Sequence, residues 1–130
     1  MDLGERRIGL AFSDTGADLV FPAGHIQRTK LADLLRRILH EAQARQVDAF
    51  VVGVPYGRDG EAGPQAEKAL GFVSALRKKT TLPVHTIDER FTSIEAEGLL
   101  REAGRQPSRE RAAVDETAAA LILKRFLDQM

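Results

Sequence analysis

The amino-acid sequence predicts an α/β fold in which a mixed five-stranded sheet is flanked by helices. In the first third of the chain, short apolar runs alternate with turn residues, a pattern typical of antiparallel strands. From Leu31 onward, helix-like and strand-like segments alternate, which favours parallel strands joined by helical crossovers. We therefore expect the first three strands to be antiparallel and the later ones parallel. The length of 130 residues suits a single domain over residues 1–130.

The first third contains the candidate antiparallel strands. A tight turn at Gly4 leads into the apolar run Ile8–Ser13, and the turn residues Asp14–Asp18 follow it. Residues 19–21 and 24–27 then provide further short strands. Short connections of this kind favour antiparallel pairing.

The remaining elements follow from their periodicity. Apolar residues recur at helical spacing from Leu31 to Ala42, which predicts a helix with one apolar face. The unbroken apolar run at residues 49–54 predicts a strand that is buried on both faces. After the glycine-containing loop at residues 55–63, we expect a helix over residues 66–79, a strand over residues 84–87, a helix from Thr92 to Gly104 that begins at a Thr92–Glu95 capping box, and a last helix from Pro107 to near Leu127.

The composition excludes several kinds of protein. The chain has no cysteine, which rules out a disulfide framework, a thiolate zinc site and a cysteine nucleophile. The three histidines lack the spacing of metal ligands. No apolar run reaches the roughly 20 residues of a membrane helix, so we expect a cytoplasmic protein. Lysine plus arginine and aspartate plus glutamate both number 19, so the net charge neither indicates nor excludes a nucleic-acid partner.

Several arginines are nevertheless candidates for contacting a phosphate backbone. The ordinary interpretation of such residues is a solvated helix face, and it remains open for each of them. The candidates are Arg6, Arg7, Arg105, Arg109 and Arg111. The segment from Arg105 to Arg111 is the most suggestive, because its sequence predicts a loop and a helix start rather than a helix face.

Three acidic residues stand at positions where chemistry is expected. Asp115 is in register with three apolar residues of the last helix, which places it on the buried face: Ala119, Ile122 and Phe126. A buried carboxylate needs a partner, and an arginine or a metal ion serves equally well. Glu89 ends a predicted parallel strand, where ligand-binding groups of α/β sheets collect. Asp2 stands just ahead of the Gly4 turn.

Each of these acids also has an ordinary interpretation. Asp2 and Glu89 occupy positions that suit turn or capping residues as well. Three further acids compete with them as turn residues: Asp14, Asp59 and Asp88. Position alone therefore leaves the choice open between separate structural acids and one joint site.

Five motifs together resemble the YqgF/RuvX family, whose members are described as Holliday-junction resolvases or as nucleases of pre-16S rRNA. In chain order the motifs are Asp-Leu-Gly-Glu-Arg-Arg-Ile-Gly at residues 2–9, Ala-Phe-Ser-Asp at 11–14, Val-Gly-Val-Pro at 52–55, Asp-Glu-Arg-Phe-Thr-Ser at 88–93, and Val-Asp at 114–115 shortly ahead of three alanines. The similarity spans nearly the whole chain. It implies an RNase H-like fold and an endonuclease that hydrolyses phosphodiester bonds.

The resemblance also implies a catalytic site. The family's first-strand acid maps to Asp2, the glutamate of its Asp-Glu-Arg motif to Glu89, and its last-helix acid to Asp115. These three residues would bind Mg²⁺ or Mn²⁺, because carboxylates brought together repel one another until a cation neutralises them, and hard oxygen ligands suit these ions. Supporting roles would fall to Asp88, Arg90 and Thr92. The implied partner is branched DNA or precursor rRNA, and a homodimer is an open possibility.

The start of the chain departs from the family pattern. The family has several apolar residues ahead of the first aspartate, whereas only Met1 precedes Asp2 here. Either the natural start lies upstream, or Asp2 sits on a short strand with a frayed end. A site on a frayed end loses the rigidity that catalysis needs, so we expect a restored apolar segment to raise stability and metal-dependent activity.

Two other classes of function compete with the nuclease. The first is a nucleic-acid-binding protein whose active site is impaired. The second is an actin-like nucleotide-binding module, because the motif at residues 2–9 also resembles the first phosphate loop of that class. Nucleotide-binding proteins of that kind need two such domains, and 130 residues supply one.

Overall fold

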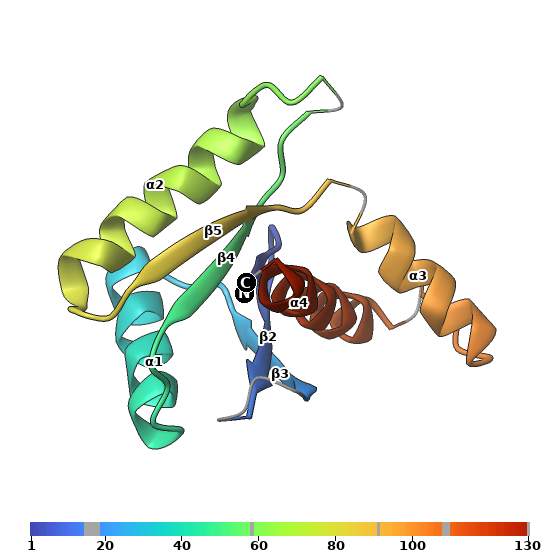
Figure 1. Ribbon diagram of the computed structural model, residues 1–130, viewed down its shortest axis with the longest axis horizontal. Helices are drawn as coiled ribbons and strands as arrows, with labels where there is room; N and C mark the ends of the chain where they lie inside the picture. Colours follow the sequence, from blue (N-terminus) through green and yellow to red (C-terminus); the bar gives the residue numbers. More distant parts are fainter. Residues whose placement is uncertain (15–18, 58, 91, 108–109, 130) are drawn as a thin grey trace.

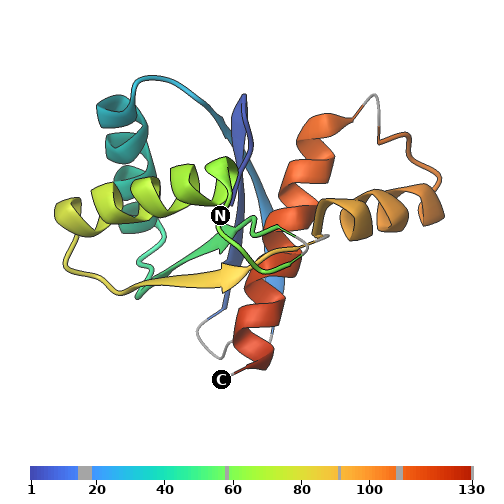
Figure 2. The same ribbon diagram turned by 90° about the horizontal axis from the view of Figure 1, so that it is seen from above.

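The computed structural model describes residues 1–14, 19–57, 59–90, 92–107 and 110–129. Its elements follow in the order β1 (Asp2–Leu3), β2 (Arg7–Ser13), β3 (Val20–Gln27), α1 (Leu31–Ala44), β4 (Phe50–Val54), α2 (Pro64–Lys79), β5 (Val84–Asp88), α3 (Thr92–Glu102) and α4 (Arg111–Asp128). Helices α1 and α2 cover one side of the strands, while α4 lies on the other side with α3 outside it (Figure 1, Figure 2). The α/β fold predicted from the sequence is confirmed. None of the helices in the described part of the chain is both long and apolar enough to cross a membrane.

The strands form two hydrogen-bonded sheets. Strands β1, β2 and β3 form an antiparallel sheet, and β4 pairs with β5 in parallel. This order of directions agrees with the prediction, but the predicted single sheet of five strands is replaced by sheets of three and two strands. The two sheets touch at Met1, whose amine donates a hydrogen bond to the Val51 carbonyl at 2.7 Å and whose carbonyl accepts one from the Gly53 N–H at 3.1 Å. Strand β1 also lies close to β4, but in the described part of the chain the backbone hydrogen bonds between the two sheets come from Met1, the residue before β1, so they make one bridge rather than a ladder.

Strand β3 joins two segments that the sequence suggested were separate strands. Gly9 pairs with His25 and Ala11 pairs with Pro22, so three steps along β3 oppose two steps along β2. Gly24 lies inside this bulge with a φ of 83°, a conformation that glycine adopts without steric cost. The bulge explains why the sequence around Gly24 resembles a turn although the strand continues through it.

The main core lies between the strands and helices α1 and α2. Its buried side chains are aliphatic apart from two phenylalanines, and they come from β2, β3, β4 and β5 as well as the two helices; they include Ile8, Leu34, Ile38, Val52, Phe72 and Leu76. A smaller cluster joins α3 to α4 through Ala96, Leu100, Val114 and Ala118. Apolar burial on both sides therefore fixes the strands between two helical layers.

Helix α4 lies very close to the strands because glycines face it. A Cβ atom added at Gly9 would lie 2.2 Å from the backbone oxygen of Asp115. A Cβ atom added at Gly53 would lie 2.6 Å from Cδ1 of Ile122 and 2.9 Å from the Glu89 carboxyl group. No side chain fits within such distances, which is the usual meaning of a glycine inside a strand. The two glycines therefore allow both Asp115 and Glu89 to approach the sheets.

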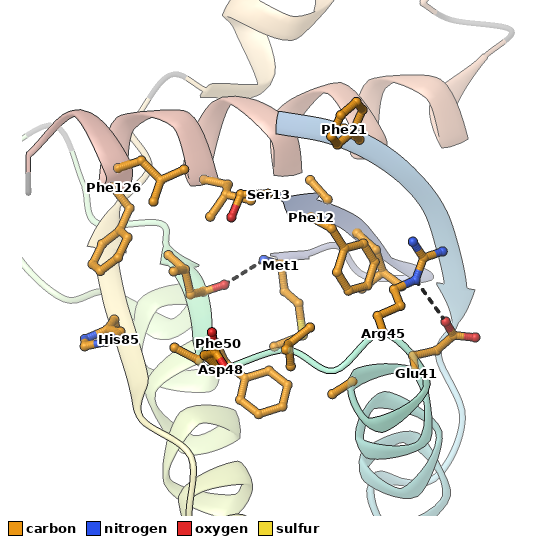
Figure 3. A pocket seen from close by; sticks show the side chains of 18 of the residues that line it. Met1, Phe12, Ser13, Phe21, Glu41, Arg45, Asp48, Phe50, His85 and Phe126 are labelled. Carbon is orange, nitrogen blue, oxygen red and sulfur yellow. Dashed lines mark hydrogen bonds and ion pairs between the residues drawn. The ribbon is translucent and has the colours of Figure 1, made fainter. Parts of the chain in front are cut away.

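A cavity of about 540 Å³ lies beside Met1, on the line of β1 (Figure 3). One wall is formed by residues 10–13 of β2, and the opposite wall by residues 48–51 at the start of β4. Side chains of α1 and α4, among them Ile38 and Phe126, line the space between these walls. Asp2 pairs with Gly9, so positions further back along the line of β1 face Leu10 and then Ala11. The cavity therefore occupies the space that a longer β1 would fill.

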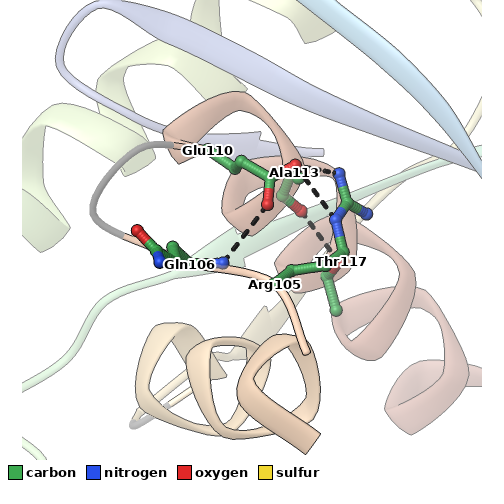
Figure 4. Close-up of polar contacts among 5 residues, drawn as sticks. All are labelled: Arg105, Gln106, Glu110, Ala113 and Thr117. Atoms are coloured by element: carbon green, nitrogen blue, oxygen red, sulfur yellow. Dashed lines mark hydrogen bonds and ion pairs between the residues drawn. The ribbon is translucent and has the colours of Figure 1, made fainter. Parts of the chain in front are cut away.

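Helix α4 begins later than predicted. The sequence suggested a start at Pro107, but the helix begins at Arg111, with Glu110 as its N-cap residue. The Glu110 carboxylate accepts hydrogen bonds from Nη2 of Arg105 at 2.6 Å and from the Gln106 backbone N–H at 3.3 Å (Figure 4). A side chain that bonds the preceding backbone in this way favours a turn over a continued helix.

An engineered strand-forming extension of about four apolar residues ahead of Met1 is expected to raise the melting temperature. The added strand would fill the cavity and pair with β2 and β4. It would also convert the Met1 amine, whose pKa burial lowers to about 6, into an amide that carries no charge. Circular dichroism on heating measures the effect. An extension of equal length made of glycine and serine is the control, and equal melting temperatures for both extensions would contradict the prediction.

The substitution Gly9→Ala is expected to lower the free energy of unfolding by about 1–3 kcal/mol, because the new methyl group must push α4 away from β2. Urea unfolding measures this change. Gly71→Ala in α2 is the matched control, since an added Cβ there meets nothing within 4 Å. That control is expected to gain about 0.5–1 kcal/mol from the better helix propensity of alanine. If Gly9→Ala and the parent unfold with the same urea midpoint, α4 does not approach β2 so closely.

Candidate active site

Asp2 and Glu89 form a buried pair of carboxyl groups. Their residues are 7% and 9% exposed, and their side chains hydrogen-bond to each other. Strand β1 holds Asp2 opposite Gly9, while Glu89 directly follows β5 and donates its backbone N–H to the Val54 carbonyl at 3.1 Å. The pair therefore lies where the antiparallel and parallel strands meet, and Asp2 is held on both sides rather than on a frayed end.

The two carboxyl groups share one proton. Burial, followed by the charge of Asp2 and the hydrogen bond to it, raises the pKa of Glu89 to about 9. Burial also raises the pKa of Asp2, although the hydrogen bond from Glu89 acts in the opposite direction. Two adjacent carboxylates in a medium of low polarity cannot both ionise unless a cation balances them. Glu89 therefore stays protonated, and its hydroxyl group donates a hydrogen bond to the Asp2 carboxylate.

Asp115 lies above the same region and is held by an arginine. Helix α4 places Asp115 over Gly9 and over the turn at Gly4, where an added Cβ would lie 3.9 Å from Oδ1 of Asp115. Its Oδ2 lies 3.6 Å from Nη1 of Arg7. The side chain is 18% exposed, so the predicted buried position is only partly buried. Of the two partners that the sequence left open for Asp115, the structure shows the arginine.

Two of the predicted supporting residues flank Glu89 and bind each other. Arg90 donates from Nε to Oδ2 of Asp88 at 2.7 Å and from its backbone N–H to Oδ1 at 3.0 Å. This turn fixes the backbone on either side of Glu89. Thr92 begins α3, but its side chain lies outside the described residues, so its capping and supporting roles stay predictions.

The arginines predicted to bind nucleic acid have different surroundings. Arg6 is exposed in the turn between β1 and β2, and Arg7 begins β2 with a side chain that is 22% exposed. Arg105 is paired with Glu110 (Figure 4). Arg109 and the side chain of Arg111 lie outside the described residues. Binding of nucleic acid by these residues stays a prediction.

The carboxyl groups offer oxygen ligands for a hard cation, but they are not gathered as a three-ligand site. In the part of the chain that the structure describes, no three histidine, cysteine, aspartate or glutamate side chains stand together in a way that would hold a metal ion. Asp2 and Glu89 are already adjacent, whereas Asp115 is paired with Arg7. The donors fit a divalent cation at two positions, and the third requires Asp115 to leave its arginine.

Two features of this region were not predicted from the sequence. The first is the role of Gly9 and Gly53 in admitting Asp115 and Glu89; the signal for Gly53 was a glycine that interrupts a buried apolar strand. The second is the buried Met1 amine, whose positive charge is felt by both Asp2 and Glu89. No sequence pattern indicates a buried chain end.

Comparison with known proteins identifies the family. The family model described as "RuvX: Holliday junction resolvase" matches residues 1–129. The chain belongs to the RuvX family. A protein from Synechococcus sp. is 42% identical over 129 residues, which cover 99% of this chain and 87% of the relative. A Roseiflexus sp. protein is 41% identical over 98% of this chain and 91% of its own length, and a Desulforudis audaxviator protein is 40% identical over the same shares.

All three RuvX relatives carry the description "Putative pre-16S rRNA nuclease". The resemblance inferred from the five sequence motifs is therefore confirmed over nearly the whole chain. The family is one of nucleases, which are hydrolases that act on phosphodiester bonds.

The raised pKa of Glu89 predicts that the metal-free protein loses stability as the pH rises. The folded protein holds the proton up to about pH 9, whereas an unfolded chain releases it near the ordinary glutamate pKa of 4.5. Stability from this group is therefore complete below that lower value and is lost as the pH rises toward the higher one. Urea unfolding in EDTA, from pH 5 to pH 9, measures the slope.

Glu89→Gln is the comparison for this pH series, and its stability should fall less steeply with pH. The lowered pKa of the Met1 amine adds a change of opposite sign between about pH 6 and 8. It is present in both proteins, so the difference between them isolates Glu89. Parallel pH profiles for the two proteins would show that Glu89 is already ionised in the fold.

Proposed function

We propose that this RuvX-family protein is a divalent-metal-dependent endonuclease that hydrolyses phosphodiester bonds of a nucleic acid. The observation that carries the proposal is the buried Asp2–Glu89 pair, with Asp115 on the neighbouring helix. Precursor 16S rRNA is the first substrate to test, because it is named for the relatives, and a four-way DNA junction is the second.

The pair has the properties expected of a cation site rather than of a structural ion pair. Burying two carboxyl groups costs free energy, and an arginine partner or an apolar replacement would remove that cost. Instead the groups face each other and retain a proton that a cation can displace. Such an arrangement is unfavourable in the resting protein and becomes favourable only when positive charge enters.

We expect Mg²⁺ or Mn²⁺ to be bound by Asp2 and Glu89 first and by Asp115 as a third ligand. When bound, such an ion supplies Lewis acidity at the phosphoryl group and lowers the pKa of a water molecule. The chain's own part is to hold the carboxylates rigidly. The bridge from Met1 to β4 fixes Asp2, and the bond from Glu89 to Val54 fixes Glu89.

Recognition of the nucleic acid is expected to rest on its backbone and shape. The sequence shows no motif that resembles an RNA-recognition motif or another aromatic platform for single-strand binding. Phosphate contacts from arginines near the site would position the substrate without reading its sequence. Arg6 is exposed in the turn that follows β1 and suits this role.

Asp2→Asn, Glu89→Gln and Asp115→Asn are each expected to reduce cleavage by about a hundredfold or more, the upper end of what even outer metal partners contribute. All three changes are close in size to the original side chain, and the first two remove a buried acid, so folding should be retained. Cleavage of a pre-16S rRNA leader and of a four-way DNA junction, with Mg²⁺ or Mn²⁺, measures the effect. Substrate binding should persist in all three variants.

Glu67→Gln in α2 is the matched control, because it makes the same kind of substitution at an exposed position outside the proposed site. It should cleave like the parent. Normal cleavage by the three site variants would show that the site is elsewhere. Binding of both substrates without cleavage by the parent, under every metal condition, would favour a nucleic-acid-binding protein with an impaired site.

A further inference from the structure

Arg7 occupies a position that the simple three-acid site does not explain. It is the first residue of β2, and its carbonyl accepts the hydrogen bond from the Gly4 N–H at 3.0 Å that closes the turn after β1. It lies two positions ahead of Gly9, over which the Asp115 backbone lies. Its guanidinium group therefore reaches the acid site from the same strand that supports Asp2.

The guanidinium group of Arg7 is incompletely satisfied. Its Nε atom is buried and has no hydrogen-bond partner in the described part of the chain. Its Nη1 lies 3.6 Å from Oδ2 of Asp115, which is within reach of an ion pair but longer than a normal hydrogen bond. A buried donor without an acceptor is costly to the fold. The guanidinium group of Arg7 can therefore donate further hydrogen bonds to another oxyanion.

We propose that Arg7 is a positioning residue that exchanges Asp115 for a phosphate group of the substrate. In the cation-free protein, Arg7 holds Asp115 away from the Asp2–Glu89 pair. Once Asp115 joins that pair as a cation ligand, the guanidinium group is released and its unused donors bind a backbone phosphate beside the scissile bond. This inference rests on the proposed nuclease function and adds a residue-specific role to it.

The chemistry of arginine suits both partners. Its planar fork of N–H donors matches a carboxylate and a phosphate equally well, and it stays charged at any working pH. Lysine would keep the charge but lose the fork. Arg6, the neighbouring residue, is exposed and has the same charge. Substituting Arg6 therefore shows the effect of losing one positive charge, which can be compared with the effect of losing the Arg7–Asp115 contact.

The test measures Mn²⁺ binding and cleavage together, in the full-length protein. In Arg7→Ala, Mn²⁺ should bind about two- to fivefold more tightly by calorimetry, because the competing ion pair is gone. Cleavage of whichever nucleic acid the parent cuts should fall at least about tenfold, because the phosphate contact is lost. Arg7→Lys should bind Mn²⁺ like the parent and still cleave slowly. Arg6→Ala should leave Mn²⁺ affinity unchanged.

Opposite changes in metal affinity and cleavage separate this role from a structural one, which would weaken both. Arg7→Gln serves as the second variant if Arg7→Ala does not fold, since it keeps part of the aliphatic stem and an N–H donor group while removing the charge. Cleavage by the parent together with unchanged or weaker Mn²⁺ binding in the Arg7 variants would overturn the exchange and leave the nuclease proposal standing. A parent that neither binds Mn²⁺ nor cleaves would overturn both.

Discussion

The contact on which the site depends is the hydrogen bond between two buried carboxyl groups, Asp2 and Glu89. It joins Asp2, the first residue of β1, to Glu89, the residue that follows β5, and these two strands belong to different sheets. The contact therefore lies where the antiparallel and parallel parts of the fold meet. Groups of like charge do not gather in a core by chance, because burial penalises each charge and their mutual repulsion adds to the cost. The fold tolerates them by retaining a proton, and a proton is a charge that the cation of the proposed function would displace.

Glycine makes this arrangement possible from the opposite face. Helix α4 brings its backbone against Gly9 and its Ile122 against Gly53, and the Glu89 carboxyl group fills the remaining space above Gly53. Larger residues at either position would separate the helix from the strands and move Asp115 away from the pair. The strands therefore carry no side chain at the two positions where α4 and Glu89 come closest to them. The thick aliphatic core is on the other face, under α1 and α2, where it stabilises the fold without constraining the site.

Much of this fold was predictable because local periodicity reports local structure. The helix at Leu31 and the apolar strand before Pro55 appear where their patterns place them, and Glu89 ends a parallel strand as expected. The motifs also pointed to Asp2 and Glu89, which lie in contact, whereas Asp115 is paired with Arg7. Contacts between distant residues were less accessible: nothing in the sequence links Arg7 to Asp115, and the break suggested at Gly24 is a bulge within one strand. The start of α4 moved to Arg111 because the side chain of Glu110 stabilises a turn that helix propensity ignores.

The resting site balances its charges with groups that a cation can replace. Asp2 and Glu89 hold one proton between them, and Asp115 is paired with the guanidinium group of Arg7. In the proposed exchange a divalent ion enters and the proton leaves to solvent, so the local charge becomes more positive by one. Arg7 stays on β2, and its guanidinium group becomes available to a phosphate. A polyanionic substrate is repelled by an uncompensated acidic cluster, and this exchange ensures that it meets a cation and a released arginine instead.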